Sequence, residues 1–152
     1  FFFKQKTAYE IYQCDWSSDV CSSDLYIIED ATIGAGAATG TINYDLLSQS
    51  ILYYTTNASG NWTVNFRGNS GATLNSMLET GQSITCTFLV TQGATAYYNS
   101  AVTIDGTSVT PVWQGGVAPA EGNASSLDVY TYAIIKTANA TFKVLASLTK
   151  FA

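Results

Sequence analysis

Alternation of apolar and polar side chains with a period of two is the feature of this sequence that most constrains its fold. Residues 61–67 place Trp62, Val64 and Phe66 on one face of an extended segment and polar side chains on the other. Residues 83–91 alternate in the same way. This pattern is typical of half-buried antiparallel strands, in which one face of each strand packs on a core.

Turn-forming residues divide the rest of the chain into further short strands. We expect these strands over 41–46, 51–56, 101–104, 107–113, 127–135 and 141–148. Asp105 and Gly106 supply the positive φ angles of a hairpin turn, and Pro111 indicates a bulge or an edge strand. Residues 73–78 fit a helical turn, and 115–125 form the longest predicted loop. About seven or eight strands with frequent turns predict an all-β domain over 41–152, an antiparallel β-sandwich or jelly-roll-like fold.

Residues 1–25 have no regular periodicity and resemble a translated oligonucleotide. Residues 4–11 read KQKTAYEI and residues 15–25 read DWSSDVCSSDL, which two fixed parts of a short-read sequencing adapter encode in the right order and frame. We interpret 1–25 as an adapter-derived artefact that is not native and exclude it from fold reasoning. Residues 26–40, rich in glycine and alanine, are interpreted as a linker or a truncated upstream segment. We therefore expect the native N-terminus, with any targeting signal, to be missing.

Composition limits the chemistry that the chain can perform. The sequence has no histidine, which removes histidine-based catalytic triads, histidine metal ligands and the usual acid–base group near neutral pH. Six Lys and Arg residues against eleven Asp and Glu residues give a net charge of −5, which argues against nucleic-acid binding. The longest apolar runs, such as 88–90, are too short to cross a bilayer, so we expect no membrane insertion.

Candidate catalytic groups are scarce. Cys86 faces inward on its predicted strand and has no histidine to activate it, so we predict a core role. The carboxylates are scattered at turns and strand ends, whereas a glycosidase needs two of them within about 5–10 Å across a cleft. Asp105 is predicted to be a turn residue. We therefore predict a non-enzymatic protein with no catalytic residue, no cofactor site and no metal site.

Aromatic residues close to predicted loops are the best candidates for ligand binding. Tyr97, Tyr98 and Trp113 could stack against sugar rings or anchor a protein interface. Adjacent tyrosines on a strand point to opposite faces, so Tyr97 and Tyr98 would contribute one ring between them to any platform. The alternative is that most aromatic side chains lie in the core or in subunit contacts.

Several words in the second part of the sequence resemble a module of tailed-phage virion proteins. They are YDLLSQSILYYT at 44–55, NWTVNFRG at 61–68, TGQSI at 80–84, AYY at 96–98, WQGG at 113–116, GNASS at 122–126 and YAIIKT at 132–137. The resemblance is to a module of marine-phage proteins, often found at the C-terminal end of tail-fibre or other virion structural proteins. It covers most of residues 43–152.

The resemblance implies a non-enzymatic structural module located in the virion, in the tail, the neck or a fibre, that contributes to host attachment. It implies contact with other virion subunits, formation of a homotrimer and contact with a host surface glycan. The sequence itself has no heptad repeat that would specify an oligomeric state. The alternative function is a carbohydrate-binding β-sandwich module of a larger protein, with Tyr97, Tyr98 or Trp113 exposed.

Overall fold

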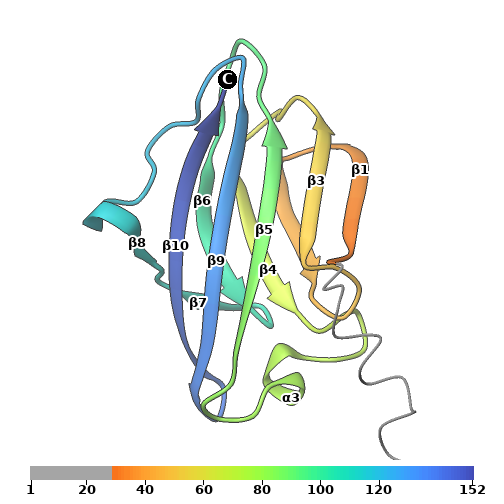
Figure 1. Ribbon diagram of the computed structural model, residues 1–152, viewed down its shortest axis with the longest axis vertical. Helices are drawn as coiled ribbons and strands as arrows, with labels where there is room; N and C mark the ends of the chain where they lie inside the picture. Colours follow the sequence, from red (N-terminus) through yellow and green to blue (C-terminus); the bar gives the residue numbers. More distant parts are fainter. Residues whose placement is uncertain (1–28) are drawn as a thin grey trace, which may run out of the picture.

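The computed structural model describes residues 29–152, which form two β-sheets that face each other (Figure 1). The six-stranded sheet has the strand order β1-β3-β5-β9-β10-β8, and the four-stranded sheet has the order β2-β4-β6-β7. The all-β prediction is confirmed, with ten strands in this part of the chain. The elements are β1 (Ala31–Ala37), β2 (Gly40–Asp45), β3 (Ile51–Thr56), β4 (Trp62–Arg67), α3 (Leu74–Met77), β5 (Ser83–Thr91), β6 (Asn99–Ile104), β7 (Thr107–Val109), β8 (Val112–Trp113), the 3-10 turn η1 (Gln114–Gly116), β9 (Leu127–Ala138) and β10 (Thr141–Phe151).

Consecutive strands from β1 to β6 alternate between the two sheets. Within each sheet the neighbours β1–β3–β5 and β2–β4–β6 are therefore parallel, because the chain crosses to the opposite sheet before it returns. Among the described strands, antiparallel pairing occurs in β5–β9, β9–β10 and β6–β7. Both sheets are mixed, and the expectation of a purely antiparallel fold is corrected. Side-chain alternation reports which face is buried but not the direction of the neighbouring strand.

A single core rich in aromatic rings joins the two sheets. Phe88 of the six-stranded sheet meets Tyr44 and Trp62 of the four-stranded sheet, with ring centroids 6.5 and 6.0 Å apart. Phe66 and Tyr132 approach to 4.9 Å across the same space. These rings are all at most 1% exposed. The inward faces predicted for residues 61–67 and 83–91 are therefore confirmed.

Strand β1 lies within residues 26–40, which the sequence analysis interpreted as a glycine- and alanine-rich linker or a truncated upstream segment. Ala31–Ala37 pairs in parallel with β3, from Ala31 opposite Ile51 to Gly34 opposite Tyr54. A Cβ atom at Gly34 would lie 3.2 Å from the Tyr54 ring, so glycine there lets the ring pack over the edge strand. The glycine-rich composition thus serves strand packing. The adapter-like residues 1–25 lie outside the described residues.

The predicted hairpin turn is confirmed at Asp105 and Gly106, whose φ angles are 51° and 80°. The arm predicted over 107–113 divides into β7 and β8. At Pro111 the chain leaves the four-stranded sheet, and β8 then pairs with β10 at the edge of the six-stranded sheet. Because proline cannot donate to a ladder, its position between two short edge strands is the expected one.

Candidate functional site

Trp113 belongs to β8, the edge strand that lies beside β10 in the six-stranded sheet (Figure 1). It pairs with Ala146 of β10, and its ring packs edge-on against the rings of Tyr130 and Tyr132, each at 6.4 Å. The side chain is half-buried. Trp113 therefore covers the core on one side and reaches the surface on the other.

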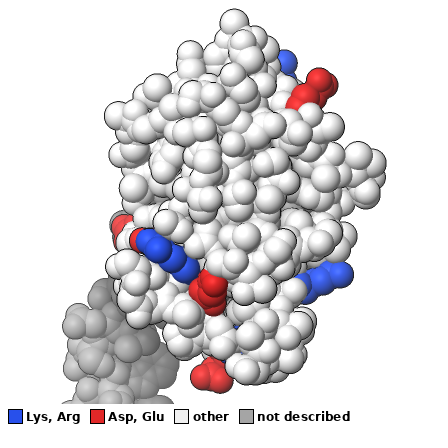
Figure 2. All heavy atoms as spheres, turned by 180° about the vertical axis from the view of Figure 1, so that it is seen from behind, with Lys and Arg blue, Asp and Glu red and all other residues white. Residues whose placement is uncertain are grey.

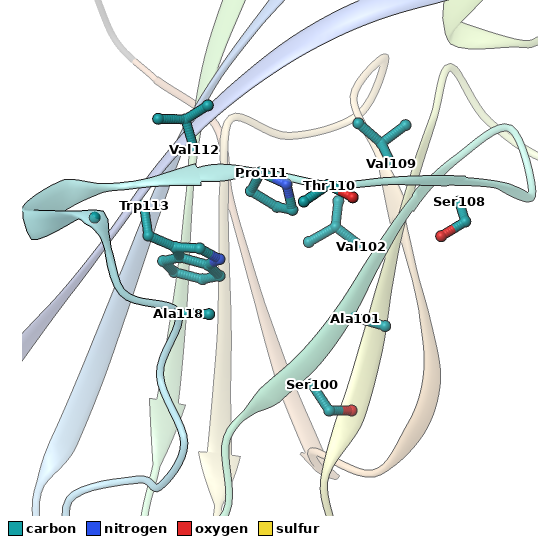
Figure 3. Close-up of a pocket in the computed structure, with 11 residues that line it drawn as sticks. Ser100, Ala101, Val102, Ser108, Val109, Thr110, Pro111, Val112, Trp113 and Ala118 are labelled. Carbon is teal, nitrogen blue, oxygen red and sulfur yellow. The ribbon is translucent and has the colours of Figure 1, made fainter.

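A hollow of about 470 Å³ lies beside Trp113 (Figure 3). Figure 3 shows the indole ring at one end and Ser108 at the other, with Val102 and Pro111 between them. Small-molecule sites usually measure about 300–1,000 Å³, so the volume suits a small ligand. The hollow thus combines the face of an aromatic ring with the hydroxyl groups of Ser100, Ser108 and Thr110. The wall is formed by Ser100, Ala101, Val102, Ser108, Val109, Thr110, Pro111, Val112, Trp113, Gly116 and Ala118.

Tyr97 and Tyr98 do not line this hollow. Tyr97 packs against the core, its N–H donates to Gln92 Oε1 at 3.0 Å, and its carbonyl accepts from Gln92 Nε2 at 2.6 Å. The Tyr98 N–H donates to Asn61 Oδ1 at 3.2 Å. Both tyrosines are half-buried. The three candidate aromatics therefore do not form one platform, and Trp113 alone contributes to the hollow.

A buried carboxylate, which the sequence analysis did not single out, anchors the loop that follows Trp113. Asp128 is 0% exposed and accepts hydrogen bonds from Gln92 Nε2 at 3.1 Å, from the Asn123 backbone N–H at 3.0 Å and from Asn123 Nδ2 at 2.7 Å. A Cβ atom on Gly122 would lie 2.1 Å from the Tyr97 carbonyl oxygen. The long predicted loop is thus fixed to β9 and to the segment after β5. One pattern in the sequence indicates that Asp128 is buried, because the alternation places it on the same face of its strand as the tyrosines that point inward.

Two charged side chains hold α3 from its two ends. The Asp105 carboxylate accepts from the backbone N–H groups of Leu74 at 2.7 Å and Asn75 at 3.0 Å. The buried Lys136 Nζ donates to the carbonyls of Asn75 at 2.6 Å and Leu78 at 2.7 Å. Asp105 is therefore a turn residue, as predicted, and also supplies acceptors to the first N–H groups of the helical turn.

The remaining chemistry-bearing groups also have structural partners. Asp45 Oδ1 lies 2.6 Å from Arg67 Nε, and this hydrogen bond raises the pKa of Arg67. Cys86 is 2% exposed and free, and burial raises the pKa of its thiol, which confirms the predicted core role. Within residues 29–152, no three His, Cys, Asp or Glu side chains are grouped to hold a metal ion. Across the same residues, no helix is long and apolar enough to cross a membrane.

Comparison with known proteins finds no matching family model, no matching curated protein and no matching solved structure. The function is therefore inferred from the residues and their arrangement.

Proposed function

We propose that residues 31–152 form a non-enzymatic structural module of a tailed-phage virion, located in the tail, the neck or a fibre and contributing to host attachment. The words that resemble tailed-phage structural proteins motivate the proposal. The observation that supports it best is the arrangement of Asp128 and Lys136, the charged side chains that are buried in the described chain. Their hydrogen bonds go to protein groups that fix a loop and a helical turn. Groups engaged in this way stabilise a scaffold.

A ladder of polar side chains on the outer face of the four-stranded sheet also supports a structural role. Asn65 Nδ2 donates to Asn43 Oδ1 at 2.9 Å, and Asn65 Oδ1 accepts from Thr103 Oγ1 at 2.8 Å. Such cross-strand pairs stabilise a sheet directly. Figure 2, which views the molecule from behind, shows charged side chains at only a few positions. A polar surface of amides and hydroxyls with few charges suits a durable part of a particle.

The two facing sheets are best assigned to the β-sandwich class in a mixed-strand form. A jelly roll is built from antiparallel Greek keys. The parallel neighbours among β1 to β6 depart from that pattern, so the sandwich is the assignment that we propose.

Proteomics of purified particles tests the virion proposal. We expect peptides from residues 31–152 in particles of a phage whose genome encodes this sequence, enriched with the tail after the particles are dissociated. Tail, neck or baseplate genes beside this gene would agree with that result. Peptides found in the infected-cell lysate but consistently missing from the particles would contradict the proposal.

The alternative, a carbohydrate-binding module, is favoured by one observation, the hollow of about 470 Å³ beside Trp113. A glycan array with the unchanged domain, Trp113→Ala and Tyr98→Ala tests it. Carbohydrate binding predicts a signal that Trp113→Ala abolishes and that Tyr98→Ala retains, because Tyr98 lies outside the hollow. Circular dichroism must show that both variants fold. An array with no signal from the unchanged domain would reject this alternative.

A further inference from the structure

The outer face of the six-stranded sheet carries almost no charge. Strand register places Ile33, Tyr53, Leu89, Val129 and Thr149 side by side in one row across five strands. Among the outward-facing residues of these described strands, Lys143 alone is charged. The neighbouring rows contain Ala31, Ile51, Thr87, Thr131 and Ser147, then Thr85, Ala133, Leu145 and Val112, then Thr91, Leu127 and Phe151, and then Ser83, Ile135 and Lys143.

Large apolar side chains on this face reach the solvent. Ile33 is 70% exposed, Phe151 55%, Val112 46% and Leu145 43%. The outward residues of the central strands β5 and β9 between them are mostly half-buried by their own neighbours. Twelve of the twenty residues in these rows are apolar, seven are threonine or serine and one is charged, so the face is broad and nearly uncharged, with exposed apolar side chains of the kind that interaction sites carry.

The other sheet shows that this surface does not follow from overall composition. The outer face of the four-stranded sheet carries the Asn43–Asn65–Thr103 ladder and the ion pair of Asp45 with Arg67. Those side chains satisfy one another, and their polar groups suit contact with water. Of the two outer faces, only that of the six-stranded sheet is dominated by apolar residues and threonine.

The size and the charge distribution of this face suit a second copy of itself. With strands about 4.8 Å apart and outward residues about 6.6 Å apart along a strand, roughly twenty residues cover roughly 650 Å². Two copies would bury roughly 1,300 Å² in total, above the roughly 1,000 Å² that a specific interface requires. Lys143 lies in the row at one end of the face, opposite Ile135. About a two-fold axis that lies in the interface and runs across the strands, this end would meet the far end of the other copy, and the two lysines would stay apart.

We propose that a second copy of this chain packs face to face on the outer surface of the six-stranded sheet, about a two-fold axis. The proposal deepens the structural function proposed above, on which it rests, by naming the contact that such a subunit would use. A homotrimer would need two different patches on each copy, because its contacts are heterologous. The nearly uncharged rows form one continuous patch, which favours a pair.

Sedimentation velocity over a concentration series tests the proposal. Thr85→Lys combined with Leu145→Lys adds two charges at exposed positions of the face. Thr41→Lys combined with Ala101→Lys adds the same charge at exposed positions on the outer face of the other sheet. We expect the unchanged domain and the second variant to form dimers. The first variant should associate more weakly by roughly a hundredfold or more, because lysines would be buried without partners.

A monomer at every concentration, a trimer, or a dimer that the Thr85→Lys and Leu145→Lys variant leaves intact would overturn the proposal. If the circular dichroism spectrum shows that this variant is unfolded, Ile33→Lys, at the edge of the same face, replaces it and should weaken association in the same way. A monomeric domain whose peptides are present in virions would reject the two-fold contact and leave the structural function standing. A dimer formed by a protein that is missing from virions would support the two-fold contact and reject the structural function.

Discussion

Replacing Asp128 with alanine should destabilise the domain more than any surface substitution, because it leaves two half-buried donors of Asn123 without their acceptor. The backbone N–H and Nδ2 of Asn123 would each lose the carboxylate, whereas Gln92 Nε2 would keep the Tyr97 carbonyl at 2.6 Å. An orphaned donor costs about 1–3 kcal/mol when it is buried, and hydrogen bonds to a charged acceptor lie in the upper part of that range. Two donors lose their acceptor, so we expect the free energy of unfolding to fall by about 2–4 kcal/mol for Asp128→Ala.

Asparagine at the same position should have an intermediate effect. Asp128→Asn keeps one acceptor, and a rotated Asn123 amide can accept from the new nitrogen, so the loss is that of charge assistance, about 1–3 kcal/mol. Urea unfolding at neutral pH measures both variants. Glu121→Gln is the matched control, because Glu121 is an exposed carboxylate on the same loop and should change stability by less than about 0.5 kcal/mol.

Amide hydrogen exchange adds a local readout to these variants. Asp128→Ala should raise the exchange rate of the Asn123 amide and of the loop before β9, while the amides of β4 follow global unfolding. A loss below about 1 kcal/mol for Asp128→Ala, or the same loss for Glu121→Gln, would refute the assignment of Asp128 as the anchor of the loop.

Three further predictions test other contacts. Gly122→Ala should lower the free energy of unfolding in urea by about 1–3 kcal/mol, because the new Cβ atom would lie 2.1 Å from a backbone oxygen. Gly71→Ala is the control and should be nearly neutral, because its Cβ atom would have its nearest contact at 3.6 Å. Equal effects of the two substitutions would contradict this prediction. Lys136→Met should lower the free energy of unfolding by about 1–3 kcal/mol and increase amide hydrogen exchange in α3, because two carbonyl groups lose their donor. Unchanged exchange in α3 would count against this prediction. Burial raises the pKa of the Cys86 thiol above the usual 9.0 and the pKa values of Tyr44 and Tyr132 above the usual 10.0, so the unfolding free energy should begin to fall above about pH 9 and fall more steeply above about pH 10, by up to about 1.4 kcal/mol per pH unit for each group. A stability that does not change with pH well above 10 would contradict this.

Patterns that depend on neighbouring residues predicted the local structure well. The alternation over 61–67 identified Trp62, Val64 and Phe66 as core, and each is at most 1% exposed. Asp105 and Gly106 predicted their turn because few residues adopt positive φ without cost. Strand direction depends instead on where the chain goes between strands. A connection that crosses to the opposite sheet has no short sequence motif comparable to the two residues of a hairpin turn, so the parallel pairs could not be predicted.

The candidate site was predicted in part. Trp113 lines a hollow, but the position of Tyr97 and Tyr98 away from it depends on how the Gln92 side chain binds the backbone of Tyr97. Asp128 was missed because a carboxylate among tyrosines reads as a solvent-facing residue. Its burial becomes favourable only when Asn123, five positions earlier in a loop, supplies two donors.

Strand β9 shows why the outer face of the six-stranded sheet needs a covering. Alternation over 127–135 defines two faces, and hydropathy alone would bury the face of Leu127, Val129 and Ile135. The structure buries the opposite face, because Tyr130 and Tyr132 fill the aromatic core and the charged residues at the two ends of that face find hydrogen-bond partners.

The sheet consequently carries apolar side chains on both of its faces. The four-stranded sheet covers the inner side. Its own outer side is satisfied by polar pairs, so the exposed apolar side chains of the two sheets are concentrated on the outer face that contains Val129 and Leu145. A covering for that face must come from outside the described fold, and a second copy supplies one of matching size and with no charge directly opposed.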